Sequence, residues 1–235
     1  MRFLVTRPQP ECGRTARKIR ALGHEADEMP LLEQTVTIPD RLDLQAISAL
    51  AVTSARIAPI LAGHNQFPAL RTLSVYAVGD RTANALRQAG WPHVISAAGA
   101  VDDLVDLIAG RHRDGSILYV AAGDRAGDLE KALSDRDIEC HVCEAYRMIK
   151  LTRLDDAIEK RLQMGAYAGI LVFSRRTAEA FADIVRSFKW RTRASNLPVY
   201  AISSQAGEPL RGMANLEVAD EPTEDAVLRA ALSIP

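Results

Sequence analysis

Short polar residues, glycines and arginines follow apolar stretches of the sequence at points where parallel β-strands would end. They are Thr6, Arg7, Thr53, Ser54, Gly79, Thr82, Gly123, Arg125, Ser174, Arg175, Ser203 and Ser204. In open α/β sheets, ligands bind outside the carboxyl ends of the strands. Several of these residues also precede expected helices, whose free N–H groups and dipole favour anions. The pattern predicts a site for an anionic ligand, although a Ser or Thr in this place is also a common helix N-cap.

A tyrosine and an arginine, Tyr146-Arg147, lie near the end of the stretch from Ile138 to Lys150, in which apolar and polar residues alternate. This period of two predicts a strand with one set of side chains on each face, Ile138, Cys140 and Val142 against Glu139, His141 and Cys143. A phenol can donate a proton, so Tyr146 is the best candidate acid in this stretch. The alternative is that Tyr146 only packs within the strand.

Cys140 and Cys143 form a Cys-x-x-Cys inside the same stretch. A redox or zinc motif of this kind needs a strand-to-helix turn or a second pair of ligands, and the sequence offers neither. We therefore interpret the pair as ordinary strand cysteines. The total of three cysteines and the lack of an export signal also argue against a disulfide framework.

Standard cofactor motifs are absent from the sequence. The segment Gly123 to Gly127 lacks the glycine triad of a dinucleotide fold, and the chain contains neither a P-loop lysine motif nor a Gly-x-Ser-x-Gly elbow. The histidines show no spacing typical of metal ligands; they are His24, His64, His93, His112 and His141. We expect a site without cofactor or metal.

Composition limits the possible partners. The chain has 235 residues, 48% of them hydrophobic, with 29 basic against 30 acidic side chains. The balance of charge gives no reason to expect nucleic acid or a membrane surface as a partner. No apolar run is long enough for a signal sequence or a membrane span, so we expect a cytoplasmic protein.

Strand and helix patterns alternate along the whole chain. Strands are expected at 2–8, 24–33, 47–54, 73–79, 93–96, 117–123, 138–150, 169–174, 199–204 and 216–219. Helices are expected at 11–22, 55–62, 80–90, 100–109, 124–137, 154–163, 177–188, 205–212 and 223–232. This order predicts an α/β protein with mainly parallel, Rossmann- or flavodoxin-like sheets covered by helices on both faces.

The sequence also contains a permuted internal repeat. The matched pairs are 51–54 with 171–174, 76–83 with 200–207, 100–107 with 223–228, and the unit around Tyr119 with the unit around Leu4. The unit around Tyr119 is the last one in the central part of the chain, whereas the matching unit around Leu4 is the first one in the chain. We therefore expect a discontinuous outer domain, 1–33 plus 151–235, an inserted domain, 38–145, and two crossing hinge strands, 34–37 and 146–150. One continuous doubly wound sheet is the alternative.

Scattered motifs over essentially the whole chain resemble those of the uroporphyrinogen-III synthase family. They are Val5-Thr-Arg-Pro8, Arg20-Ala-Leu-Gly-His24, Met29-Pro-Leu-Leu32, Val52-Thr-Ser54, Tyr76-Ala-Val-Gly-Asp-Arg-Thr-Ala83, Gly123-Asp-Arg125 with Leu129, Glu144-Ala-Tyr-Arg147 and Phe173-Ser174. No single motif is specific, but their order and spacing together are typical of this family.

The resemblance implies two α/β domains joined by a two-stranded β connector. It also implies a cofactor-free hydro-lyase reaction, in which hydroxymethylbilane loses water and closes to uroporphyrinogen III with its last ring inverted. Tyr146 matches the family tyrosine proposed as the proton donor, and the polar residues at the strand ends would hold the substrate's carboxylates. A cytoplasmic monomer of tetrapyrrole and haem biosynthesis, in transient contact with the preceding pathway enzyme, is the further expectation.

The sequence departs from the family pattern at two places. Ser203-Ser-Gln-Ala206 stands where many members carry a glycine and threonines, and Arg56 stands where an asparagine is common. The first departure leaves a second hypothesis open, in which the fold is kept as a non-catalytic two-lobed module that binds a tetrapyrrole or another anion.

Overall fold

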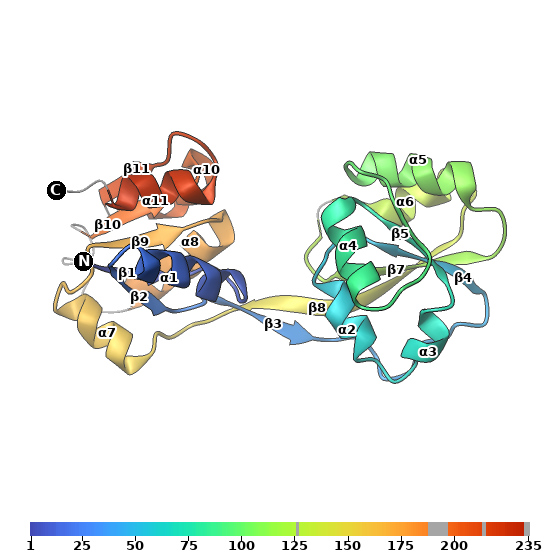
Figure 1. Cartoon of the computed structure of the whole chain (residues 1–235), viewed down its shortest axis with the longest axis horizontal. Helices are drawn as coiled ribbons and strands as arrows, with labels where there is room; N and C mark the ends of the chain where they lie inside the picture. The colour runs from blue at the N-terminus through green and yellow to red at the C-terminus, as the bar shows by residue number, and fades with distance from the viewer. Residues whose placement is uncertain (126, 188–196, 213–214, 233–235) are drawn as a thin grey trace. The chain divides into compact units, whose positions relative to one another are not determined.

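The computed structural model describes residues 1–125, 127–187, 197–212 and 215–232 (Figure 1). Contacts divide the chain into two compact units, which we call unit 1, Met1–Glu33 with Ile149–Pro235, and unit 2, Gln34–Met148. The chain crosses from one unit to the other twice, within strands β3 (Leu32–Val36) and β8 (Cys140–Lys150). That residues 34–37 and 146–150 act as a hinge stays a prediction.

Unit 1 contains a parallel five-stranded sheet with the order β11-β10-β9-β1-β2. Its strands are β1 (Arg2–Val5), β2 (Glu25–Glu28), β9 (Gly169–Val172), β10 (Pro198–Ala201) and β11 (Asn215–Val218). Its helices are α1 (Glu11–Ala21), α7 (Asp156–Gln163), α8 (Arg175–Ser187), α10 (Ser204–Gly207), the 3-10 turn η1 (Glu208–Leu210) and α11 (Glu224–Leu232).

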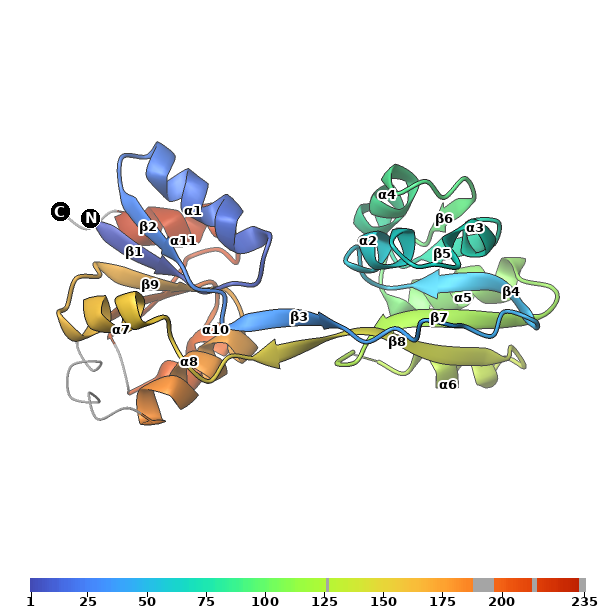
Figure 2. The same ribbon diagram turned by 90° about the horizontal axis from the view of Figure 1, so that it is seen from below.

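Helices cover both faces of the unit 1 sheet, as continuous apolar strands require. Phe3 and Val5 pack with Ile19 of α1 and Val227 of α11 on one face. On the other face, Leu4 packs with residues of α7 and α8 such as Phe181. Figure 2 shows α1 and α11 on one side of this sheet and α7 and α8 on the other.

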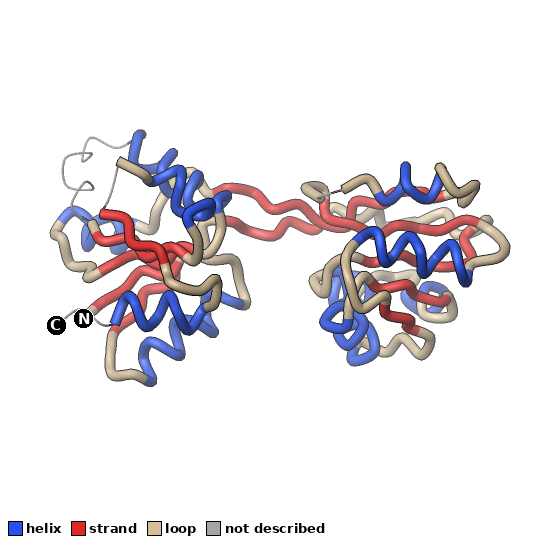
Figure 3. The backbone as a smooth tube through the Cα atoms, turned by 90° about the horizontal axis from the view of Figure 1, so that it is seen from above, coloured by secondary structure: helices blue, strands red, loops and turns tan. Residues whose placement is uncertain are grey.

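Unit 2 is built around a six-stranded sheet with the order β3-β8-β7-β4-β5-β6. Besides β3 and β8, its strands are β4 (Ile47–Val52), β5 (Ser74–Ala77), β6 (Val94–Ser96) and β7 (Ser116–Ala122). Its helices are α2 (Ile57–Ala62), α3 (Phe67–Leu70), α4 (Asp80–Gln88), α5 (Val101–Arg111) and α6 (Leu129–Ser134). β4 to β8 pair in parallel. The chain from Leu31 to Thr37 runs antiparallel to β8, because the N–H of Leu151 donates to Leu31 and the N–H of Thr37 donates to Ala145. Figure 3 shows β3 and β8 as two strands side by side.

Two apolar clusters lie on opposite faces of the unit 2 sheet. Leu50 and Val52 pack with Ile57 and Leu61 of α2 on one face. The other cluster joins Ala51, Tyr119 and the apolar side of α5 and α6. The alternation along β4 therefore divides its side chains between two layers of helices, as expected for a doubly wound α/β unit.

The strand orders of the two units confirm the internal repeat. Matched as the sequence predicts, β9, β10, β11, β1 and β2 of unit 1 correspond to β4, β5, β6, β7 and β8 of unit 2. The order β11-β10-β9-β1-β2 then equals the order β6-β5-β4-β7-β8. The α/β fold class with parallel sheets is likewise confirmed.

Several expected elements differ in detail. The strand expected at 24–33 is two strands, because Pro30 has no N–H for a ladder and separates β2 from β3. The helix expected at 124–137 is only α6, which the Asp128 side chain caps by accepting from the Lys131 N–H at 3.1 Å. The helix expected at 177–188 begins at Arg175 instead, and Phe188 lies outside the described residues.

The two faces expected from Ile138 to Cys143 are confirmed, since Ile138 and Cys140 pack against the cluster with Tyr119 and Cys143 lies in the opposite cluster. The alternation does not continue past Glu144. Val142 is exposed and Cys143 is buried in the cluster with Val52. The ladder to β7 shifts register, since Ala121 pairs with Glu144 but Ala122 pairs with Tyr146. An extra residue in one strand reverses the faces of all the side chains after it. No helix in the described part of the chain has the length and apolar character needed to cross a membrane.

Candidate functional site

The carboxyl ends of β4 and β7 meet where the strand order of unit 2 reverses. β5 and β6 lie on one side of β4, and β7 and β8 on the other. This reversal is the place where doubly wound sheets bind ligands. Thr53 and Ser54 directly follow β4, and Gly123 directly follows β7, so the sheet brings together three of the residues predicted from sequence.

Tyr146 and Ser54 form the hydroxyl pair of this edge. Their oxygens lie 3.2 Å apart, and the Tyr146 ring is buried in the cluster with Ile57. The Ser54 oxygen also accepts from the N–H of Arg56 at 3.3 Å. A serine that already accepts from the backbone is well placed to fix the direction of the phenol O–H.

A second hydroxyl pair joins Thr53 and Tyr119, whose oxygens lie 3.1 Å apart. Burial raises the pKa of Tyr119. The Arg125 guanidinium lies 6.0 Å from the centre of the Tyr119 ring and is ion-paired with Glu130. The hydrogen bond to Glu130 raises the pKa of Arg125, so Arg125 supplies a fixed positive charge here. The sequence did not single out this pair, because Thr53 follows β4 whereas Tyr119 lies within β7.

Gly123 leaves room for a carboxylate group on β8. A side chain at this position would place its Cβ 2.6 Å from Oε2 of Glu144. Glu144 accepts from Nε and Nη2 of Arg147 at 3.1 and 2.8 Å and from the Thr37 hydroxyl at 3.0 Å. The hydrogen bond from Arg147 lowers the pKa of Glu144. Sequence reasoning missed Glu144, whose contact with Gly123 depends on the register of β8 against β7.

Gly79 and Thr82 lie at the start of α4, after strand β5. Gly79 is the N-cap and has no side chain with which to cap the helix, so the first turn of α4 presents backbone N–H groups toward this edge. Thr82 lies within the first turn and is buried. The predicted residues of unit 2 thus lie along one edge of one sheet.

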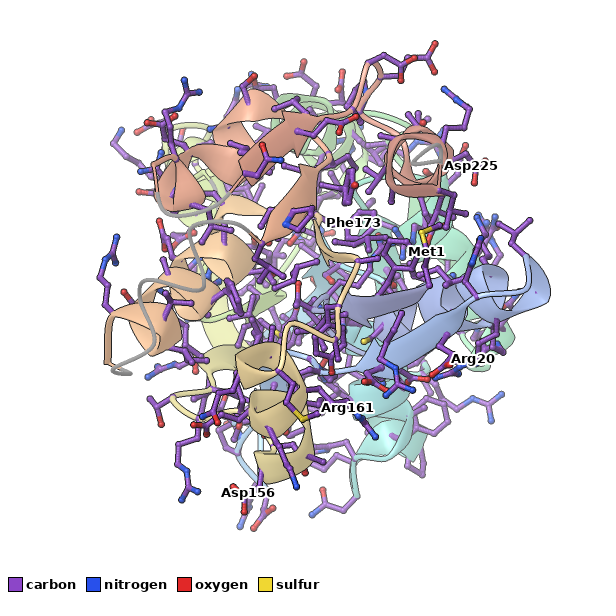
Figure 4. The ribbon with its side chains drawn as sticks, turned by 90° about the vertical axis from the view of Figure 1, so that its left-hand side faces the viewer. Met1, Arg20, Asp156, Arg161, Phe173 and Asp225 are labelled. Carbon is purple, nitrogen blue, oxygen red and sulfur yellow. The ribbon has the colours of Figure 1, made fainter. Side chains whose placement is uncertain are left out.

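Arg7 lies at the corresponding edge of unit 1, after β1. Its guanidinium stacks 4.2 Å from the centre of the Phe173 ring. Nη1 donates to Glu224 at 3.0 Å and to Thr15 at 3.1 Å. Burial lowers the pKa of Arg7. Figure 4 labels Phe173 just after β9 and Asp225 on α11, the helix that also carries Glu224.

Two of the predicted serines of unit 1, Ser174 and Ser203, act as helix caps. Ser174 accepts from the N–H of Thr177 at 3.2 Å, and Ser203 accepts from the N–H of Ala206 at 3.2 Å. Ser204 is exposed in the first turn of α10, and Arg175 pairs with Glu179 at 3.1 Å. The N-cap alternative is therefore confirmed for Ser174 and Ser203.

Cys140 and Cys143 contact different faces of the unit 2 sheet. Cys140 packs against the cluster with Tyr119, and Cys143 belongs to the cluster with Val52. All three cysteines are free. Over the described ranges, no group of three or more His, Cys, Asp and Glu side chains is arranged to hold a metal ion.

Comparison with known proteins agrees with the fold. The whole chain is similar to the uroporphyrinogen-III synthetase of Helicobacter pylori, at 19% identity, with a TM-score of 0.64 and 100% of both chains covered. It is also similar to a mutant uroporphyrinogen III synthase of the extremely thermophilic bacterium Thermus thermophilus, at 17% identity, with a TM-score of 0.54 and 99% of both chains covered. No curated protein matches the chain.

These structural likenesses concern the fold, whereas a family model identifies the sequence. The model described as uroporphyrinogen-III synthase HemD matches residues 13–229. The match includes both units and both hydroxyl pairs of the unit 2 edge. The chain therefore belongs to the uroporphyrinogen-III synthase family, HemD, the lyases of tetrapyrrole biosynthesis.

Proposed function

We propose that this protein closes hydroxymethylbilane to uroporphyrinogen III, with inversion of the last pyrrole ring and loss of water, and without a cofactor. The observation that carries the proposal is the Tyr146 hydroxyl, which lies 3.2 Å from Ser54 at the ligand-binding edge of the unit 2 sheet. In a chain of this family, a phenol held at that edge is the natural proton donor.

The first step breaks the bond between the terminal carbon and its hydroxyl. The Tyr146 O–H gives its proton to the departing oxygen, which leaves as water, and the carbon is left as an azafulvenium cation. The substituted carbon of the last ring attacks the cation and gives a spiro intermediate. The older bond from this carbon to the neighbouring ring's methylene then breaks and leaves a second azafulvenium cation at that methylene. The free α-carbon of the inverted ring attacks this cation and closes the macrocycle. The closed macrocycle then loses one proton as its pyrroles regain aromaticity. The same number of protons returns the Tyr146 tyrosinate to the phenol, so the reaction consumes no net proton.

Charge at the two sheet edges supports a substrate with many carboxylates. Arg125 and the first turn of α4 lie at the edge of unit 2, and Arg7 and Arg175 lie at the edge of unit 1. Several weak donors of this kind can hold a flexible polyanion in the geometry for ring closure. Because the azafulvenium cation is already reactive, holding its two ends together is a major part of the catalysis. We propose Arg7, Thr53, Ser54, Gly79, Thr82, Gly123, Arg125, Ser174, Arg175, Ser203 and Ser204 as the substrate-binding set.

The isomer assay tests the proposal. Purified protein is given freshly made hydroxymethylbilane, and the uroporphyrinogen isomers are separated after oxidation. We expect the type III isomer at a rate proportional to enzyme concentration. Spontaneous closure gives the type I isomer, so a product that is type I alone would refute the synthase activity.

The second candidate is a binding module that keeps the fold without the reaction. The stretch Ser203-Ser-Gln-Ala206, in which Ser203 serves as a helix cap, is the observation that favours it. Such a protein would bind a tetrapyrrole or a related polyanion in a titration yet leave the isomer ratio unchanged.

We also propose a cytoplasmic monomer that contacts the preceding pathway enzyme transiently. Size-exclusion chromatography with and without that enzyme would test the oligomeric state and the contact.

A further inference from the structure

The backbone of β8 is bulged at the residue before Tyr146. Glu144 pairs with Ala121 of β7, and Tyr146 pairs with the next residue, Ala122, so Ala145 is the extra residue. In a regular strand, Glu144 and Tyr146 would share a face and Arg147 would lie on the other. The bulge instead places Tyr146 on the face of Ile57, and it places Arg147 beside Glu144.

Hydrogen bonds hold the bulge from both neighbouring segments. The carbonyl of Ala145 accepts from the N–H groups of Thr37 and Ile38 at 2.9 and 3.2 Å. The carbonyl of Tyr146 accepts from the N–H of Gly123 at 2.8 Å. The backbone on each side of the bulged residue is therefore fixed to a different partner.

The side chain of Glu144 ties these segments together. Its carboxylate receives two parallel hydrogen bonds from Arg147 and one from the Thr37 hydroxyl. It lies against Gly123, where any Cβ would take its space. A bidentate arginine–carboxylate pair has a defined geometry. Glu144, which precedes the bulged residue, is therefore linked to Arg147, which follows it, and to Thr37 on the neighbouring segment.

We infer that Glu144, held by Arg147 and Thr37, is a positioning residue that fixes the β-bulge and so directs the Tyr146 hydroxyl toward Ser54. The inference rests on the proposed function only for its effect on turnover. Glu144 acts through Tyr146, and its carboxylate takes no part in the proton transfer.

Kinetics of Glu144→Ala give the first test. A misplaced catalytic group costs on the order of tenfold to a hundredfold in rate, so we expect kcat for the type III isomer to fall by about that factor and KM to change less. Glu144→Gln keeps an acceptor oxygen for Arg147 and Thr37 and should recover part of the loss. Asp106→Asn is the matched control, because Asp106, on α5 of the same unit, forms an exposed ion pair with Arg136. Its kcat should equal that of the parent.

A double-variant cycle separates positioning from an independent contribution. If Glu144 acts through the phenol, Glu144→Ala should slow the Tyr146→Phe protein far less than it slows the parent. An equal loss in both backgrounds, or an unchanged kcat for Glu144→Ala in the parent, would overturn the inference. Thr37→Val serves as the milder variant if Glu144→Ala does not fold, and a smaller loss in the same direction is expected.

A spectroscopic measurement keeps the inference separate from the proposed function. The chain has five tyrosines, and the Tyr146 signal in a spectrum of ring-labelled tyrosine can be assigned from Tyr146→Phe. We expect Glu144→Ala to shift that signal and Asp106→Asn to leave it in place. A parent protein without type III activity would refute the proposed function alone, whereas an unmoved Tyr146 signal in folded Glu144→Ala would refute the positioning role.

Discussion

Arg7 and Glu224 form an ion pair of 3.0 Å although 217 residues separate them in the sequence. The pair joins the turn after the first strand to the last helix of unit 1. Lys18 approaches the other carboxylate oxygen of Glu224 at 2.7 Å, and Thr15 donates to the same oxygen as Arg7. Arg7 therefore has a structural partner within unit 1, and a substrate carboxylate would share its guanidinium with Glu224.

Removal of the Glu224 charge should destabilise unit 1 in a pH-dependent way. Burial alone would raise the pKa of Glu224, but hydrogen bonds from Lys18 and Thr15 outweigh burial and lower it. A lowered carboxyl pKa stabilises the fold above the ordinary value near pH 4.5, and this stabilisation is lost as the pH falls through the lowered value. We expect Glu224→Gln to reduce the free energy of unfolding at pH 7 by about 1 kcal/mol, after allowance for partial exposure.

Urea unfolding at several pH values measures this effect. The difference between Glu224→Gln and the parent should begin to shrink as the pH falls below 4.5 and should vanish once the pH has passed through the lowered pKa of Glu224, where the parent carboxyl takes up its proton. Glu221→Gln is the control, because Glu221 is mostly exposed and lies 4.0 Å from Arg229. A difference that stays constant from pH 7 to pH 3 would contradict the charge-based explanation.

Gly169 should not tolerate a methyl group. It lies in β9, and a Cβ there would approach the buried Tyr200 ring to 2.5 Å. Because a buried ring cannot move without displacing its neighbours, Gly169→Ala should cost about 1–3 kcal/mol in unfolding free energy. Gly110→Ala is the contrasting variant, since a Cβ there meets nothing within 4 Å near the end of α5. It should stabilise the protein by about 0.5–1 kcal/mol, and a loss of stability as large as that of Gly169→Ala would contradict the steric argument.

The sequence predicted the sheets well because periodicity and repetition are local signals. The match of 51–54 with 171–174 predicted that β4 and β9 hold the same place in their sheets, and the strand orders agree. The placing of Thr53, Ser54 and Gly123 at one edge followed from the same pattern. Residues that end parallel strands of one sheet must lie together, whatever the sequence distance between them.

The pairing of individual side chains could not be predicted. The partner of Arg7 is on a helix at the far end of the chain. An ion pair between distant residues produces no periodic pattern in the sequence. The bulge at Ala145 was not predicted, because a period of two assumes that each residue of one strand pairs with one residue of its neighbour. That single extra residue moved Tyr146 to the face of Ser54, so the most important contact of the site depends on an irregularity.

The cysteines should react slowly in the native protein. Burial raises the pKa of Cys12 to about 12 and that of Cys140 to about 11, and burial also raises the pKa of Cys143. Because the thiolate is the reactive form, a disulfide reagent at pH 8 should label the folded protein far more slowly than the unfolded protein. Three thiols should be titrated in denaturant. Rapid labelling of both Cys140 and Cys143 in the native protein would contradict this prediction and would support a redox role for the Cys-x-x-Cys.

Loss of the Tyr146 hydroxyl should slow turnover without harming the fold. The ring is buried against Ile57, and phenylalanine keeps that contact while it removes the proton donor 3.2 Å from Ser54. A positioned general acid contributes roughly 10²–10⁴-fold, but the substrate ends would still be held for closure, so Tyr146→Phe should lose at least about 10²-fold in kcat and keep a residual type III activity. Tyr76→Phe is the control, because the Tyr76 ring is also buried in unit 2 and meets His112 edge-on; its rate should match the parent's. Equal rates for Tyr146→Phe and the parent would show that the proton comes from another group.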